Sequence, residues 1–305
     1  MQDLAQRFKG VFTALVTPFK NGSVDIAAFD ALVERQLSAG VTGLVPVGTT
    51  GEAATLSDEE AVELVARTAA LAKGRALVVA GAGANNTCKA VEKAKAAEAA
   101  GADALLVVTP YYNKPTQAGL TAHYGAVAEA TSLPIMLYSV PGRCGVEITP
   151  ETCATLTERH ANIVAIKEAG GNPGRVTALR RTCGNDLIIH SGDDGLTLPF
   201  LSLGACGVTS VVANVAPREM VAMVKAWENG DTSLALALND IIAELMEGMF
   251  IESNPGPVKA ALALSNLAGP ELRLPMVPVS DANRERLTGI LGRYSAAAAA
   301  FQEMR

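Results

Sequence analysis

Short apolar runs recur along the first three-quarters of this 305-residue chain, and most of their ends lie 24 to 33 residues apart. The runs are almost continuously hydrophobic, as in 104–108, which is typical of parallel strands covered on both faces. Helical periodicity follows each run. Eight strand–helix units in about 230 residues predict an α/β fold, the (β/α)8 or TIM barrel. The runs end near Val16, Val47, Ala80, Val108, Tyr138, Lys167, Ser191 and Val212.

A doubly wound sheet is the alternative fold for such a chain, and it usually carries a dinucleotide fingerprint at its first turn. The nearest candidate for that fingerprint, residues 81–86, lacks the third glycine and follows the third run. We therefore interpret 81–86 as a tight strand–helix turn and prefer the barrel.

The strand signal stops at about residue 231. Three helical stretches follow, near 232–250, 257–267 and 281–303, with proline-containing segments between them. We expect a catalytic barrel over residues 1–230 and a small C-terminal helical appendage over 231–305. The appendage would be structural or part of an oligomer contact.

Composition and charge argue against several classes of function. The net charge is −6 and no Lys/Arg-rich block is present, which argues against a nucleic-acid partner. The apolar runs are far shorter than a membrane span. The five cysteines contain no Cys-x-x-Cys pair, which favours reduced thiols and a cytoplasmic location.

Lys167 closes the apolar run 163–166, at the predicted C-terminal end of the sixth barrel strand. An ordinary lysine pKa of about 10.4 leaves roughly one part in a thousand as free amine at pH 7.5. Partial burial would lower that pKa and make the amine a nucleophile able to form a Schiff base. The alternatives are a lysine that reaches solvent, or an ion pair with Glu168.

Polar residues cluster after several runs, where a barrel enzyme carries its active site. Residues 48–52 read Gly-Thr-Thr-Gly-Glu, and the backbone of such a turn can hold a carboxylate. An ordinary turn before a helix cap at Ser57 is the alternative. Arg143 is a fork-shaped donor suited to a second carboxylate, or else a solvated loop residue. Three of the five tyrosines also stand at these ends: Tyr111, Tyr112 and Tyr138.

Other chemistries have weaker support. The three histidines show no ligand spacing, and we interpret Asp193 and Asp194 as helix caps, so no metal is expected. Without a metal, an aldol-type reaction needs an amine as its electron sink, which favours the nucleophilic interpretation of Lys167. No Gly-x-Ser-x-Gly elbow supports a serine hydrolase.

Three motifs make the chain resemble the pyruvate-dependent class I aldolase and lyase family, whose branches include N-acetylneuraminate lyases and dihydrodipicolinate synthases. The resemblance covers essentially the whole chain, and the Thr49-Thr50 pair together with Arg143 is most similar to the synthase branch. The motifs are Gly48-Thr49-Thr50-Gly51-Glu52, Tyr138-x-x-Pro141 and Ile166-Lys167-Glu168.

The resemblance implies a role for each of these residues. Lys167 would form the Schiff base with pyruvate, so that no separate cofactor is needed. Tyr138 would relay protons with Thr49 and Tyr112, the latter reaching into the neighbouring subunit's site. The remaining implied contacts are Thr50 with the pyruvate carboxylate, Arg143 with the carboxylate of the aldehyde substrate, and Gly192 and the Thr209 backbone as pocket walls.

The activity implied is a lyase reaction in which pyruvate condenses with L-aspartate 4-semialdehyde to give 4-hydroxy-tetrahydrodipicolinate, a step of lysine and diaminopimelate biosynthesis. The family implies a homotetramer built as a dimer of dimers. One alternative is another pyruvate aldolase, acting on 4-hydroxy-2-oxoglutarate or a 2-keto-3-deoxy sugar acid. A non-catalytic ligand-binding relative is another, but it would have no need of the amine and its proton relay.

Some positions depart from the family pattern. Ser139 and Cys144 replace the usual Asn and Thr, and Thr209 stands where Ile is common. At the feedback site of regulated members, histidine and glutamate positions correspond here to Ala61 and Lys89. Because a lysine ligand's ammonium would meet Lys89 as a like charge, we expect weak or absent inhibition by L-lysine.

Overall fold

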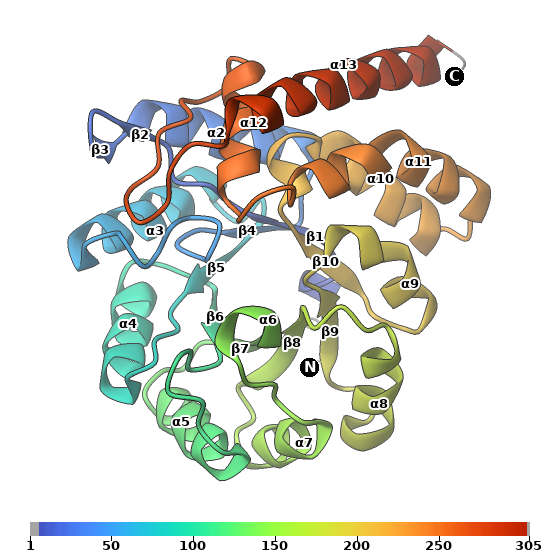
Figure 1. Ribbon diagram of the computed structural model, residues 1–305. Helices are drawn as coiled ribbons and strands as arrows, with labels where there is room; N and C mark the ends of the chain where they lie inside the picture. The colour runs from blue at the N-terminus through green and yellow to red at the C-terminus, as the bar shows by residue number, and fades with distance from the viewer. Residues whose placement is uncertain (1–5, 304–305) are drawn as a thin grey trace.

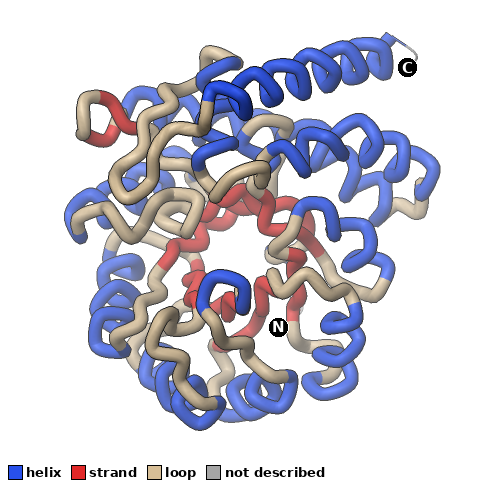
Figure 2. The backbone as a smooth tube through the Cα atoms, viewed as in Figure 1, coloured by secondary structure: helices blue, strands red, loops and turns tan. Residues whose placement is uncertain are grey.

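Eight parallel strands close into a barrel, which confirms the predicted fold class. The computed structural model describes residues 6–303. Around the barrel the strands run in the order β1-β10-β9-β8-β7-β6-β5-β4, and Figure 2 shows them as a central ring within a layer of helices. The strands are β1 (Gly10–Ala14), β4 (Gly43–Val45), β5 (Leu77–Gly81), β6 (Ala104–Val108), β7 (Ile135–Ser139), β8 (Ile163–Glu168), β9 (Ile188–Ser191) and β10 (Gly207–Ser210).

One principal helix follows each barrel strand and packs outside it (Figure 1). The helix that follows β4 begins at Ser57 with the expected capping box, in which Glu60 N donates to Ser57 Oγ and Ser57 N donates to the Glu60 carboxylate. The outer helices are α2 (Ile26–Ala39), α3 (Asp58–Ala72), α4 (Thr87–Ala99), α5 (Gln117–Glu129), α7 (Pro150–Arg159), α8 (Gly174–Cys183), α9 (Thr197–Ser202) and α10 (Pro217–Glu228).

Shorter elements decorate the connections between strands and helices. A hairpin, β2 (Phe19–Lys20) with β3 (Ser23–Val24), follows β1, and the one-turn helix α6 (Pro141–Cys144) follows β7. Two 3-10 turns, η1 (Asp194–Leu196) and η2 (Val212–Asn214), follow β9 and β10. Within residues 6–303, no helix combines the length and the apolar character needed to cross a membrane.

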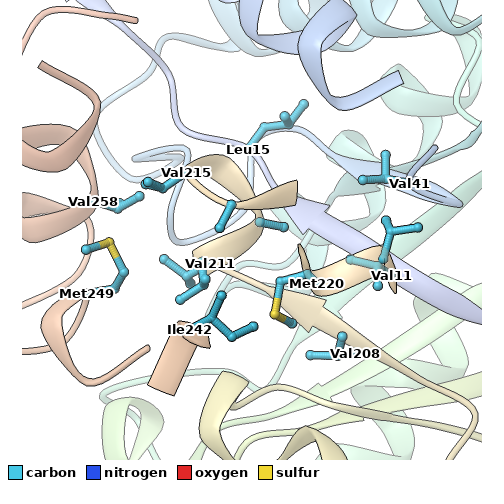
Figure 3. Packing of buried hydrophobic residues seen from close by; sticks show 14 of the residues in the cluster. Val11, Leu15, Val41, Val208, Val211, Val215, Met220, Ile242, Met249 and Val258 are labelled. Carbon is cyan, nitrogen blue, oxygen red and sulfur yellow. The ribbon is translucent and has the colours of Figure 1, made fainter. Parts of the chain in front are cut away.

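Three helices follow the barrel, close to the stretches predicted from the sequence. They are α11 (Thr232–Gly248), α12 (Gly256–Leu264) and α13 (Asp281–Glu303). One hydrophobic cluster joins them to the barrel wall, and Figure 3 shows Val11 and Val208 of the strands in the same cluster as Ile242 of α11 and Val258 of α12. The C-terminal helices therefore share a core with the β1–β10 side of the barrel.

Candidate active site

Lys167 lies at the C-terminal end of β8, inside the barrel and only 5% exposed. It is in register with Tyr138 of β7, and its Nζ lies 4.4 Å from the centroid of the Tyr138 ring. Burial lowers the pKa of the Lys167 amine to about 8, helped by the Arg143 charge and opposed by the Asp194 carboxylate. About a quarter of the side chains would then be free amine at pH 7.5.

Glu168, the next residue, points to the other face of the strand, as alternation in a β-strand requires. Its carboxylate is fully buried and pairs with Arg175 of α8, at 3.1 Å from the Nη2 atom. It also accepts a hydrogen bond from the Gly170 N–H. The alternative interpretation, in which Lys167 pairs with Glu168, is therefore wrong.

Tyr138 is a protonated hydroxyl beside that amine. Burial raises the pKa of the Tyr138 phenol to about 12, although the nearby Arg143 charge and a hydrogen bond with the Thr49 side chain act in the opposite direction. At neutral pH the phenol keeps its proton. Hydrogen-bonded to Thr49, it can donate a proton to a neighbouring oxygen and recover it.

The predicted carboxylate-binding turn, 48–52, follows β4 and carries Thr49 and Thr50. The turn closes on itself, with Gly51 N donating to Gly48 O at 3.1 Å. Thr50 is buried, and its Oγ1 accepts a hydrogen bond of 3.0 Å from the Asn254 side chain. Asn254 was not among the residues singled out as functional from the sequence, where only its place in an Asn-Pro-Gly-Pro segment could have signalled it.

Arg143 lies on α6, and its guanidinium donates to the Asn254 carbonyl oxygen at 3.4 Å. It borders a cavity of about 490 Å³ at this end of the barrel. Ala61 of α3 and Lys89 of α4 also line this cavity, and Lys89 pairs with Glu92 at 2.6 Å. Other lining residues are Thr49, Tyr111, Tyr138 and Asn254.

The two predicted pocket walls, Gly192 and Thr209, lie on neighbouring strand ends. A Cβ placed on Gly192 would lie 2.6 Å from the Ala169 Cβ and 3.0 Å from the Lys167 Cε, so the lysine stem occupies the space a side chain would need. Thr209 is fully buried on β10, and its Oγ1 lies 3.2 Å from the His190 Nδ1. The Thr209 side chain is therefore engaged inside the barrel.

Tyr112 stands apart from the other predicted residues. The residue is 89% exposed, and its backbone φ of 73° lies in the left-handed region that a bulky residue rarely adopts. The preceding residue, Tyr111, lines the cavity instead. Within one chain, the predicted proton relay therefore contains Tyr138 and Thr49, and Tyr112 is not part of it.

The prediction that Asp193 and Asp194 cap a helix is wrong. Neither the 3-10 turn η1 nor the helix α9 after it has a side-chain cap. Instead Asp194 is buried, and its Oδ2 accepts hydrogen bonds of 3.0 Å from the N–H groups of Val211 and Val212. The carboxylate thus ties the end of β9 to the segment after β10. Over residues 6–303, no group of three His, Cys, Asp or Glu side chains could hold a metal ion.

The sequence matches the dihydrodipicolinate synthetase family over residues 7–293. The chain belongs to that family. It is 50% identical to the 4-hydroxy-tetrahydrodipicolinate synthase of Anaeromyxobacter sp. (strain Fw109-5) over 289 residues, which is 94% of this chain and 98% of the relative.

Solved structures of synthases from this family share the fold over nearly the full length of the chain. The 4-hydroxy-tetrahydrodipicolinate synthase of Methylacidiphilum fumariolicum SolV superposes with a TM-score of 0.95 at 45% identity, covering 97% of this chain and 99% of that one. A dihydrodipicolinate synthase from Acinetobacter baumannii, solved in complex with pyruvate, gives a TM-score of 0.91 at 44% identity, covering 94% and 99%.

Proposed function

We propose that this protein condenses pyruvate with L-aspartate 4-semialdehyde to give 4-hydroxy-tetrahydrodipicolinate, a lyase reaction of lysine and diaminopimelate biosynthesis. The observation that carries the proposal is the buried Lys167 amine, with its pKa lowered to about 8, beside the protonated Tyr138 phenol. The activity named for relatives at about half identity over nearly the full chain supports it.

The first half of the reaction activates pyruvate. The free Lys167 amine attacks the C2 carbonyl carbon, and Tyr138, hydrogen-bonded to Thr49, supplies the proton with which the carbonyl oxygen leaves as water. The resulting iminium draws electrons from the methyl group, which loses a proton to form an enamine. Because the iminium is the electron sink, the covalent lysine adduct takes the part of a cofactor. Thr50 would hold the pyruvate carboxylate.

The second half forms a carbon–carbon bond and closes the ring. The enamine carbon attacks the aldehyde carbon of the second substrate, whose carboxylate would pair with Arg143 in the cavity lining. The substrate's own amine then attacks the C2 carbon, and Lys167 leaves as the free amine. Gly192 and the Thr209 backbone would line the pocket around the adduct.

We also propose a homotetramer arranged as a dimer of dimers, in which Tyr112 completes the proton relay of the neighbouring subunit. The 89% exposure of Tyr112 in the single chain supports this role. A cytoplasmic location is supported by the five cysteines, all of which are free thiols. We further propose that residues 1–230 form the catalytic barrel and residues 231–305 a C-terminal helical region.

A second candidate is an aldolase for 4-hydroxy-2-oxoglutarate or a 2-keto-3-deoxy sugar acid, which would use the same Lys167 imine. Arg143 in the cavity lining favours the synthase over the sugar-acid aldolase, because the aldehyde half of a sugar acid carries no carboxylate for this cation to bind.

The test combines chemical trapping with a substrate panel. Borohydride reduction in the presence of pyruvate should add the reduced pyruvate unit to the Lys167 peptide, as measured by mass spectrometry. Turnover should then occur with aspartate semialdehyde. An unmodified Lys167 would rule out the mechanism, whereas an adduct without that turnover would favour the second candidate.

A further inference from the structure

A buried ion pair joins the carboxylate-binding turn to the C-terminal region. Glu52 is the last residue of the turn, and Lys259 lies on α12; Lys259 Nζ donates to Glu52 Oε1 at 2.5 Å. The two side chains are only 1% and 2% exposed. Charges so deeply buried are stable only when they are paired and further hydrogen-bonded, so each of these side chains fixes the position of the other.

The same carboxylate has a second partner from the C-terminal region. Glu52 Oε2 accepts a hydrogen bond of 3.1 Å from the backbone N–H of Arg273. The Phe19 ring lies beside both cations, with Lys259 Nζ at 4.2 Å and the Arg273 guanidinium at 4.4 Å from its centroid. The Arg273 guanidinium is itself held by Glu60 through two hydrogen bonds, of 2.7 and 2.6 Å. The Glu52 carboxylate is therefore bound both by α12, through Lys259, and by the segment between α12 and α13, through the Arg273 N–H.

The turn needs stabilising contacts because its backbone is strained. Val47, which precedes the turn, and Glu52, its last residue, have φ values of 56° and 53°, in the left-handed region that a β-branched residue such as valine strongly disfavours. A conformation of this kind persists only where the surroundings fix it at several points. Thr17 Oγ1 donates to Gly51 O at 2.7 Å, Asn254 holds Thr50, and Lys259 holds Glu52.

Two of these three contacts with the turn come from one short segment, residues 254–259. Asn254 precedes α12 and Lys259 lies in it, so a shift of α12 would move both partners of the turn together. Asn254 and Pro255 also line the cavity, as do Thr49 and Tyr138. The C-terminal region thus contributes to the site in two ways: it lines the cavity, and it binds the carboxylate-binding turn.

We infer that Lys259 is a positioning residue for the pyruvate site: through Glu52 it fixes the turn that presents Thr49 and Thr50, and α12 thereby belongs to the active site. The inference rests on the proposed function, because it assigns the turn to the pyruvate carboxylate. Lys259 does not touch the reacting atoms. Its replacement should therefore raise the KM for pyruvate and have little effect on the KM for the aldehyde.

Three variants of the full-length protein separate positioning from stability. Lys259→Met and Glu52→Gln each leave one partner of the pair behind, whereas the double variant removes both charges. We expect Lys259→Met to have the lowest Tm, because it leaves Glu52 as an uncompensated buried charge, and the double variant to recover much of that loss. The KM for pyruvate should nevertheless stay at least about tenfold raised in the double variant, since small displacements of binding groups have large kinetic effects.

The KM for the aldehyde substrate supplies the internal comparison and should change by much less than the KM for pyruvate, because Arg143 does not contact the pair and is linked to α12 only through its hydrogen bond with the Asn254 carbonyl oxygen. Leu245→Ala is the matched control: Leu245 is fully buried on α11 in the C-terminal core, so its loss should lower Tm and leave both KM values unchanged.

A double variant whose pyruvate KM matches the wild type would overturn the inference. A rise of both KM values in proportion to the loss of Tm, shared by Leu245→Ala, would overturn it as well. Borohydride trapping of the wild-type protein is run in parallel, and failure of the Lys167 adduct there would count against the proposed function itself.

Discussion

Gly192 leaves open the space that the Lys167 side chain occupies: a Cβ on Gly192 would lie 3.0 Å from the Lys167 Cε and 3.1 Å from its Cγ. The backbone at Gly192 needs no left-handed φ, so its lack of a side chain matters for space and not for conformation. The position of the amine therefore depends on the absence of one methyl group on the neighbouring strand.

Gly192→Ala should displace the Lys167 stem or the Ala169 methyl, and we expect kcat/KM for pyruvate to fall by about tenfold or more, because misplaced reacting groups lose rate steeply. Steady-state kinetics and the yield of borohydride-trapped adduct measure this. Gly292→Ala is the control, because Gly292 lies on α13 with nothing within 4 Å of an added Cβ. It should leave kcat/KM for pyruvate and the adduct yield unchanged. Wild-type kinetics in Gly192→Ala would show that the crowding is relieved without moving the amine.

The rate of imine formation should rise with pH and level off above about 8. The Lys167 pKa is lowered to about 8, so the free-amine fraction grows roughly tenfold per pH unit below that value. The initial rate of adduct trapping with pyruvate, measured between pH 6 and 10, checks this. An inflection near 10.4, the ordinary value, would contradict the burial argument.

The same shift predicts how stability depends on pH. Between the folded pKa of about 8 and the unfolded value, the unfolded chain binds the proton and the folded chain does not, so stability rises with pH. The gain across this window is about 3 kcal/mol, and it should be absent in Lys167→Met. Urea unfolding at pH 8 and pH 10, compared between the two proteins, measures the difference.

Tyr138→Phe should keep the fold and lose the proton relay. We expect kcat to fall by roughly 10² to 10⁴, the usual contribution of a positioned acid–base group. Tyr124→Phe is a matched control, because Tyr124 of α5 is also buried and its hydroxyl donates to the Val107 carbonyl of β6 at 3.3 Å, and neither residue lines the cavity. It should cost about 1 kcal/mol of stability and leave kcat unchanged. Equal loss of activity in both variants would point to packing and not to proton transfer.

Arg143→Gln should raise the KM for aspartate semialdehyde by about tenfold or more, since a charge-assisted pair with a carboxylate contributes about 1.5–3 kcal/mol. Pyruvate trapping should persist. The trapping profile should also shift to higher pH, because the Arg143 charge lowers the pKa of Lys167. Arg181→Gln, an exposed arginine of α8, serves as the control. An unchanged aldehyde KM would favour a sugar-acid aldolase.

L-Lysine should inhibit weakly or not at all. Lys89, whose ammonium pairs with Glu92, and Ala61, which offers no polar side chain, both line the cavity. An inhibition titration with half-inhibition below about 1 mM, or about 4 kcal/mol of binding, would contradict this expectation. Lys89→Glu should strengthen any inhibition that is seen, because it replaces a like charge with an opposite one.

The number of strands and the set of residues at their ends could be predicted from the sequence, because both are consequences of one repeated local pattern. Once eight strand–helix units are counted, parallel strands must place Thr49, Tyr138 and Lys167 on the same rim. Helix starts such as Ser57 were equally accessible, since a capping box involves residues only three positions apart.

The contacts that hold the site could not be predicted in this way. Asn254 meets Thr50 across 204 positions and Lys259 meets Glu52 across 207, and nothing in either local sequence names the other partner. Asp194 had the local pattern of a helix cap, but the chain passing beside it at Val211 and Val212 offered two N–H groups instead.

The chemistry of Lys167 divides in the same way. Its place at a strand end is a property of the sequence, because strand periodicity is local. Its pKa of about 8 and the room left by Gly192 exist only once β7, β8 and β9 lie side by side and exclude water from the amine. Desolvation and crowding are sums over neighbours distant in the chain, and only the folded barrel decides which neighbours those are.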